Sequence, residues 1–157
     1  TLVNRGLNAV PFGYQTWETL TLEAGTPLFD TEIEGALPND LGLRNALDFE
    51  KGCYVGQEVV SRIENRGHPT QRLVGLAVEA CPDPGAAVFA GDEHVGDVTR
   101  AAQSPMREAP IALANLSWER PEEALKIRID GEPVSAQQVD LPFIDGSAQS
   151  ARLPTYE

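Results

Sequence analysis

The pattern of hydrophobic and polar positions changes character near residue 70 of this 157-residue chain. Upstream, apolar residues recur at helical spacing, and downstream they form short alternating runs. Trp17, Leu20 and Ala24 share one face of the segment 14–24, and Gly25 follows as a C-terminal cap. The spacing therefore predicts a helix over residues 14–24.

Two more helices are predicted before residue 70. Residues 57–65 place three apolar side chains on one side, so they favour a helix, and residues 41–49 are predicted as a shorter one. Residues 30–40 are predicted to be a loop, because Pro38-Asn39-Asp40 is typical of a turn.

The downstream region reads as a set of short strands. Leu125, Ile127 and Ile129 alternate with polar residues and precede Asp130-Gly131, a strong signal for a two-residue hairpin. Three similar runs, punctuated by Gly, Pro and Asp, lie between Arg72 and that hairpin. We therefore expect a small antiparallel sheet or barrel after a boundary near residue 70.

The composition narrows the class of protein. No apolar run approaches the length of about 18 residues needed to span a membrane, and no signal-peptide pattern opens the chain. Cys53 and Cys81 are too few for a disulfide scaffold and lack the spacing of a zinc or iron–sulfur site. We expect reduced thiols and a cytoplasmic location. Because the chain opens at Thr1 with what reads as mid-domain sequence, we also expect a fragment of a longer protein.

The charge is strongly acidic, with 24 Asp and Glu residues against 12 Lys and Arg residues. Lys51 and Lys126 are its only lysines. This balance favours a halophilic protein that works at high salt, where self-repulsion is screened. The alternative is an acidic mesophilic protein. The same charge argues against broad nucleic-acid binding, which needs a cationic surface.

One stretch of the chain does not share the acidic composition of the rest. Residues 44–72 carry five basic and four acidic residues, a net charge of +1, whereas the remainder carries seven basic and twenty acidic residues, or −13. We expect an anionic ligand to bind at this stretch, although the basic residues could also be structural.

The chemistry of this stretch concentrates in residues 51–58, KGCYVGQE. The two glycines allow a sharp turn and close approach to a ligand, and a helix starting near Gln57 would direct its free N–H groups at the loop. The helix N-terminus and Lys51 would both favour the thiolate of Cys53. Tyr54 offers an aromatic face and a hydroxyl. Read singly, Cys53 could be inert, Lys51 a surface charge and Tyr54 a core residue.

Taken together, these residues resemble a known family. The signature of YgfZ-type folate-binding proteins, in the glycine-cleavage T-protein superfamily, is closely matched by KGCYVGQE and the following VVSRIENRGHPTQRLVGL. Upstream, LEAGTPLFDTEI is similar to the superfamily element R-x-E-A-G-x-P-x-[FY]-G. The resemblance covers residues about 20 to 76.

The resemblance implies an α+β fold, with the end of a folate-binding T-protein-like domain in residues 1–70 and a small antiparallel β-barrel in 71–145. The composition of residues 146–157 predicts a loose tail. It implies that Glu23 bonds the pterin ring of tetrahydrofolate, with Lys51, Tyr54 and Gln57 shaping the pocket and Cys53 as candidate catalytic residue. The N-terminal portion of the same protein would complete the pocket.

The chain departs from the superfamily pattern at two positions. Thr21 replaces the arginine before the E-A-G element, and Asp30 replaces the glycine at its end. These differences bear on Glu23 as a ligand, and without the resemblance we would expect Glu23 to be exposed. The aspartate that T-proteins use in catalysis belongs to a part that the chain does not contain.

The sequence favours the first of three functions and leaves the other two open as alternatives. The first is a YgfZ-like accessory protein that binds tetrahydrofolate and supports the assembly or repair of iron–sulfur enzymes, including tRNA-modifying ones, as its clients. The second is the aminomethyltransferase of glycine cleavage, a folate-dependent one-carbon transferase. The third is a non-catalytic β-barrel interaction module. No metal site is expected, because His68 and His94 stand alone in the sequence.

Overall fold

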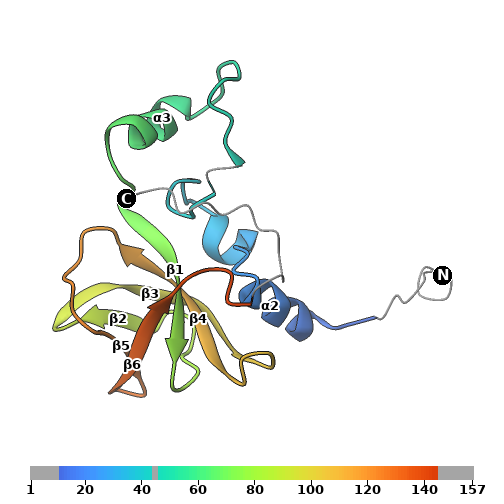
Figure 1. Cartoon of the computed structure of the whole chain (residues 1–157), viewed down its shortest axis with the longest axis vertical. Coiled ribbons are helices and arrows are strands. Elements are labelled where there is room, and N and C mark those ends of the chain that lie inside the picture. The colour runs from blue at the N-terminus through green and yellow to red at the C-terminus, as the bar shows by residue number, and fades with distance from the viewer. Residues whose placement is uncertain (1–10, 44–45, 145–157) are drawn as a thin grey trace.

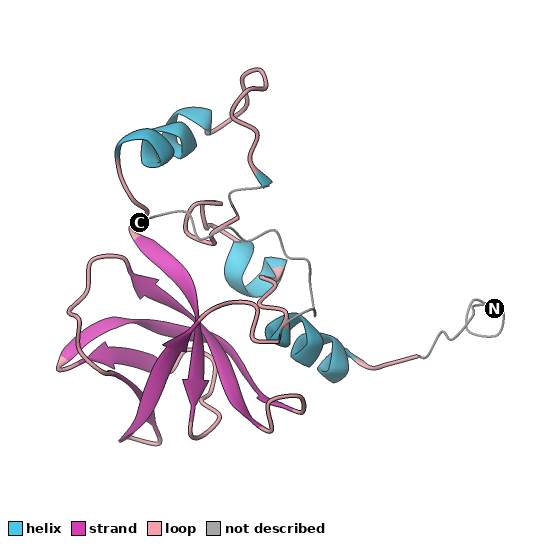
Figure 2. Ribbon diagram, in the orientation of Figure 1, coloured by secondary structure: helices cyan, strands magenta, loops and turns pink. Residues whose placement is uncertain are grey.

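The computed structural model describes residues 11–43 and 46–144, and its main feature is a closed six-stranded barrel preceded by helices (Figures 1 and 2). The helical elements are α2 (Tyr14–Glu23), the π-helix η1 (Phe29–Ile33) and α3 (Gln57–Arg66). The strands are β1 (Gln71–Val78), β2 (Ala87–Ala90), β3 (Glu93–Ser104), β4 (Ala109–Ser117), β5 (Leu125–Ile129) and β6 (Glu132–Val139). The predicted α+β fold with a small antiparallel barrel is confirmed.

The barrel closes in the order β1-β4-β3-β2-β5-β6, and every neighbouring pair is antiparallel. Strands β5 and β6 are joined by the hairpin predicted at Asp130-Gly131. Both residues have positive φ, 51° and 87°, as a two-residue turn between right-twisted strands requires. Because the barrel is closed, every strand is hydrogen-bonded on both sides and no strand edge is left unpaired. The helices therefore pack on a fully paired sheet.

The barrel has a core on each side of its wall. Its interior is filled by small and branched apolar residues: Val74, Leu76, Val78, Val88, Ala90, Val95, Val98, Ala112, Ala114, Leu116, Leu125, Ile127 and Ala136. A second cluster covers the outer face of β1 and β4 and consists of Leu22, Leu41, Leu73, Ile111, Leu113 and Phe143. Successive residues of a strand point to opposite faces, so both faces are buried where α2 covers the wall.

Two helices predicted from the sequence are confirmed, α2 at residues 14–23 and α3 at residues 57–66. The α-helix predicted over residues 41–49 is wrong in the described residues 41–43 and 46–49, which form turns and irregular loop apart from a 3-10 conformation at Ala46. Asp40 explains part of the difference, because its carbonyl accepts a 2.8 Å hydrogen bond from the amide of Leu73 on β1. None of the described helices is long and apolar enough to cross a membrane.

The loop predicted over residues 30–40 is only partly correct, because η1 occupies Phe29–Ile33. The carboxylate of Glu32 folds back on this turn and accepts hydrogen bonds from the amide of Leu28, at 2.8 Å, and the hydroxyl of Thr31, at 2.6 Å. The sequence signal for a turn at Pro38-Asn39-Asp40 is confirmed.

Gly96 allows the close approach of β3 to β4. Its φ is 154°, and a Cβ at this position would collide with the backbone carbonyl oxygen of Asn115. We expect Gly96→Ala to lower the free energy of unfolding by about 2 kcal/mol, because backbone on the neighbouring strand must move. Gly52→Ala is the matched control, since the space around Gly52 is open within 4 Å. Urea unfolding of both variants measures the difference, and equal stabilities would contradict this reading.

Candidate functional site

Glu23 is the last residue of α2 and is buried against the barrel, with 4% of its surface exposed. Its Oε1 accepts a 2.6 Å hydrogen bond from the hydroxyl of Ser104 and a 3.4 Å bond from the amide of Met106. Its backbone carbonyl accepts a 2.9 Å bond from the amide of Phe143. The expectation from the sequence alone, an exposed Glu23, is therefore wrong.

A buried ion pair lies close to Glu23 and was not predicted from the sequence. Arg100 on β3 donates from Nε to Oε1 of Glu32 at 2.8 Å, and the two side chains are 10% and 0% exposed. The same guanidinium donates from Nη1 to the hydroxyl of Thr21, at 3.0 Å, and from Nη2 to the carbonyl of Thr26, at 2.7 Å. One arginine of the barrel therefore joins α2, the following turn and η1.

The charge of Glu32 is fixed by these contacts. Burial alone would raise the pKa of its carboxyl group, but hydrogen bonds from Arg100, the amide of Leu28, Thr31 and Thr99 outweigh burial and hold the pKa below its usual value. Glu32 therefore stays ionised beside Arg100. The two charges offset each other, and both side chains also make hydrogen bonds to neighbouring residues. The pair therefore joins the helical region to the barrel.

The conspicuous motif KGCYVGQE forms the loop before α3. Gly56 is the N-cap of the helix, and Oε1 of Gln57 accepts a 3.3 Å hydrogen bond from the amide of Tyr54. The ammonium of Lys51 lies 4.9 Å from the ring centroid of Tyr54, a cation–π contact, and Cys53 is exposed. The loop thus presents a cation, an aromatic ring and an accessible thiol together.

The candidate residues fall into two groups in this structure. Lys51, Cys53 and Tyr54 lie on the loop before α3 and Gln57 begins that helix, whereas Glu23 lies at the barrel. No hydrogen bond or ion pair joins Glu23 to that loop within the described residues. In Figure 1, α3 and its preceding loop project away from the barrel, while α2 lies along it. The described residues therefore place the candidate residues in two separate groups, with no hydrogen bond or ion pair between Glu23 and the loop.

A cavity of about 540 Å³ is lined by residues of both α2 and β3. Its lining includes Leu22, Thr99, Arg100 and Cys81, and does not include Glu23. Burial, aided by the negative charge of Asp83, raises the pKa of the Cys81 thiol. Cys81 is therefore kept in its less nucleophilic form, unlike a reactive cysteine.

Neither histidine belongs to a metal site in the described part of the chain, where no group of three His, Cys, Asp or Glu side chains could hold an ion. His68 stacks on Trp118 and lies 3.5 Å from the carboxylate of Glu119. His94 lies 3.1 Å from the carboxylate of Asp97. Each histidine thus has a single carboxylate partner.

Comparison with known proteins finds a family match for the barrel and similar proteins over most of the chain. Residues 71–145 match the family described as "Glycine cleavage T-protein C-terminal barrel domain". The aminomethyltransferase of Streptomyces coelicolor is 37% identical over 143 residues, which are 85% of this chain and 38% of that protein. The aminomethyltransferase of Pseudothermotoga lettingae is 32% identical over 156 residues, 96% of this chain and 42% of that protein.

A solved structure supports the fold. The crystal structure of the glycine cleavage system aminomethyltransferase T from Bartonella henselae superposes with a TM-score of 0.75 and 24% sequence identity. The match covers 84% of this chain and 39% of that one. The chain therefore spans about two fifths of the length of the proteins to which it is similar.

Proposed function

We propose that this chain, whose residues 71–145 match the family described as "Glycine cleavage T-protein C-terminal barrel domain", is the C-terminal part of a folate-dependent aminomethyltransferase. The observation that carries the proposal is that similarity to aminomethyltransferases extends well beyond the barrel, over 85% of the chain. The reaction proposed is transfer of the methylene carbon of an aminomethyl-dihydrolipoyl carrier to tetrahydrofolate, which yields methylene-tetrahydrofolate, ammonia and the free dihydrolipoyl carrier.

In this proposal Glu23 recognises the pterin ring. A carboxylate only accepts hydrogen bonds, so it suits the N–H and amino groups of a pterin. Oε1 of Glu23 is held by Ser104 and Met106, whereas Oε2 accepts no hydrogen bond from the described residues and remains for a ligand. The contacts within the chain thus fit the role that the family resemblance suggests.

The loop of Lys51 serves the other end of the ligand in this proposal. Tetrahydrofolate carries carboxylates on its glutamate tail, which attract the ammonium of Lys51 in an otherwise acidic protein. Tyr54 offers an aromatic face, and Gln57 holds the loop through the amide of Tyr54. Glu23 and this loop would bind one ligand only if the complete protein brings them together.

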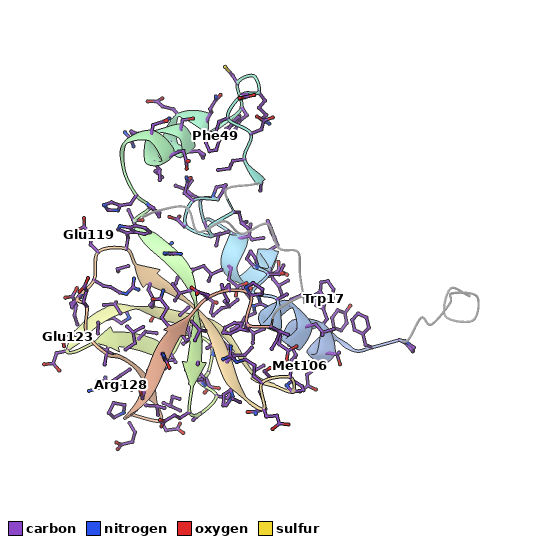
Figure 3. The ribbon with its side chains drawn as sticks, viewed as in Figure 1. Trp17, Phe49, Met106, Glu119, Glu123 and Arg128 are labelled. Carbon is purple, nitrogen blue, oxygen red and sulfur yellow. The ribbon has the colours of Figure 1, made fainter. Side chains whose placement is uncertain are left out.

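The remaining three fifths of the proposed protein would complete the pocket. This is supported by the outer face of α2, where Tyr14, Trp17 and Leu20 are exposed. Figure 3 shows Trp17 projecting from α2 away from the barrel. An apolar face of this kind is typical of a surface that another part of a protein covers.

The exposed free thiols of Cys53 and Cys81 suit a reducing compartment, such as the cytoplasm.

The test is formation of methylene-tetrahydrofolate by the full-length protein that carries this chain, supplied with an aminomethyl-loaded lipoyl carrier protein and tetrahydrofolate. We expect product that depends on the loaded carrier, with unloaded carrier as the control. A folded protein that binds tetrahydrofolate but forms no product would contradict the transferase proposal.

A second candidate is favoured by one observation, the exposed thiol of Cys53 beside Lys51 in KGCYVGQE. A YgfZ-like accessory protein that supports iron–sulfur enzymes would use this thiol. The two functions predict different results for Cys53→Ala in the full-length protein. As a transferase, the variant keeps its methylene-tetrahydrofolate formation within about twofold, because the reaction needs no thiol.

An accessory protein would behave differently. Cys53→Ala would then abolish complementation of a strain with an iron–sulfur-enzyme defect, while the matched variant Cys81→Ala would still complement. Full rescue by Cys53→Ala would remove the accessory role from consideration. Loss of rescue together with absence of transfer would replace our proposal with the accessory function.

A further inference from the structure

The carboxylate of Glu23 is held by the turn that joins β3 and β4. The hydroxyl of Ser104 is the principal donor, at 2.6 Å, and its residue is completely buried. The same oxygen accepts a 3.0 Å hydrogen bond from the amide of Arg107. The Ser104 hydroxyl therefore donates its proton to Glu23, while its oxygen accepts from the amide of Arg107.

The hydrogen bonds around Glu23 form a closed cycle. Arg107 donates from Nη1 to the carbonyl of Phe143 at 3.2 Å, and the amide of Phe143 donates to the carbonyl of Glu23 at 2.9 Å. Glu23 is thus fixed both through its side chain and through its backbone. The cycle links the end of α2, the β3–β4 turn and the segment after β6.

Oε2 of Glu23 has a different environment from Oε1. Among the described residues, none donates a hydrogen bond to Oε2, and this atom is not completely buried. One oxygen is therefore anchored and the other is presented in a fixed direction. A fixed acceptor binds a ligand better than a mobile one, because the loss of rotamer freedom has already occurred.

We propose that Ser104 is a positioning residue, which holds Glu23 so that Oε2 accepts hydrogen bonds from the pterin ring of folate. The inference rests on the proposed function, in which Glu23 binds that ring. It assigns a role in ligand binding to the end of β3 and the turn that follows it, through their hydrogen bonds to Glu23.

Stability alone does not explain the arrangement of Ser104. The helical region is already joined to the barrel by the buried pair of Arg100 and Glu32 and by the apolar cluster that contains Leu22. Ser104 directs its proton to one oxygen of one carboxylate. Figure 3 shows the turn, marked by Met106, beside α2.

The experiment is a double-mutant cycle in the full-length protein, read by calorimetric titration with tetrahydrofolate. We expect Ser104→Ala to weaken binding about tenfold, the usual worth of a hydrogen bond to a charged group. In a Glu23→Ala background, we expect Ser104→Ala to cause no further loss, because Ser104 acts through Glu23. Ser135→Ala, on the exposed side of β6, is the matched control and should bind as wild type.

A second variant keeps the test valid if Ser104→Ala does not fold. Ser104→Cys retains a side chain of similar size but donates only weakly, so it should also weaken binding while remaining folded. Additive losses from Ser104 and Glu23 variants, or wild-type binding by both Ser104 variants, would overturn the inference and leave the proposed function intact. If folded wild-type protein does not bind tetrahydrofolate, the proposed function fails, and the inference fails with it.

Discussion

Replacing Arg100 with alanine is expected to lower the free energy of unfolding of the chain by about 3–5 kcal/mol. The substitution leaves Glu32, whose side chain has no exposed surface, without its cationic partner. It also removes the donors to the hydroxyl of Thr21 and the carbonyl of Thr26. A buried charge left without its partner is far more costly than a lost surface ion pair.

Urea or guanidinium unfolding of the variant measures this effect. The matched control is Arg128→Ala, because Arg128 is an exposed arginine on β5 whose guanidinium lies 4.9 Å from the ring of Phe89. We expect the control to lose about 0.5–1 kcal/mol. Similar losses for the two variants would show that Arg100 does not hold the helical region on the barrel.

The same pair predicts how stability depends on pH. The pKa of Glu32 is lower in the folded chain than its usual value, so its contribution is fully present above the unfolded pKa, about 4.3. That contribution is lost as the pH falls through the folded pKa. We therefore expect the difference between wild type and Arg100→Ala to narrow as the pH falls below about 4.3 and through the lowered folded pKa, where Glu32 of the wild type becomes protonated and loses its charge interaction with Arg100.

Glu23→Ala is expected to weaken tetrahydrofolate binding by the full-length protein about 100-fold, because the pterin donors lose a pre-oriented acceptor. Glu18→Ala is the control, since Glu18 is exposed on the same helix. Titration calorimetry of both variants gives the ratio of affinities. Equal binding by the two variants would exclude Glu23 as a folate ligand.

Local patterns in the sequence predicted most of the fold. Alternation at Leu125, Ile127 and Ile129 and the turn at Asp130-Gly131 are properties of neighbouring residues, so the β5–β6 hairpin could be identified directly. The helix predicted over residues 41–49 failed because a partner distant in sequence, the amide of Leu73, holds Asp40 in a turn. Apolar spacing contains no information about such a bond.

The candidate site could be predicted only in part for the same reason. KGCYVGQE is contiguous, so its cation, ring and thiol were expected together on one loop. Ser104 is 81 residues from Glu23, and Arg100 is 68 residues from Glu32, so neither partnership leaves a local signal. Both contacts form only because the fold packs β3 against the helical region.

Position 21 illustrates the limit of a motif. The resemblance led us to expect an arginine there, and Thr21 made the match weaker. In the structure, the guanidinium of Arg100 reaches from the barrel to the hydroxyl of Thr21. A cationic side chain is thus present at this point, although it comes from a different part of the sequence.

Adaptation to high salt, suggested by the acidic composition, stays a prediction.

The most direct test of the account is calorimetric titration of the full-length protein with tetrahydrofolate, beside its Lys51→Ala variant. The account predicts saturable binding with one site per chain, weakened by Lys51→Ala because the ligand's carboxylates lose a cation. Absence of binding by folded wild-type protein would contradict the account, and a barrel that serves only as a protein-interaction module would then be the better description.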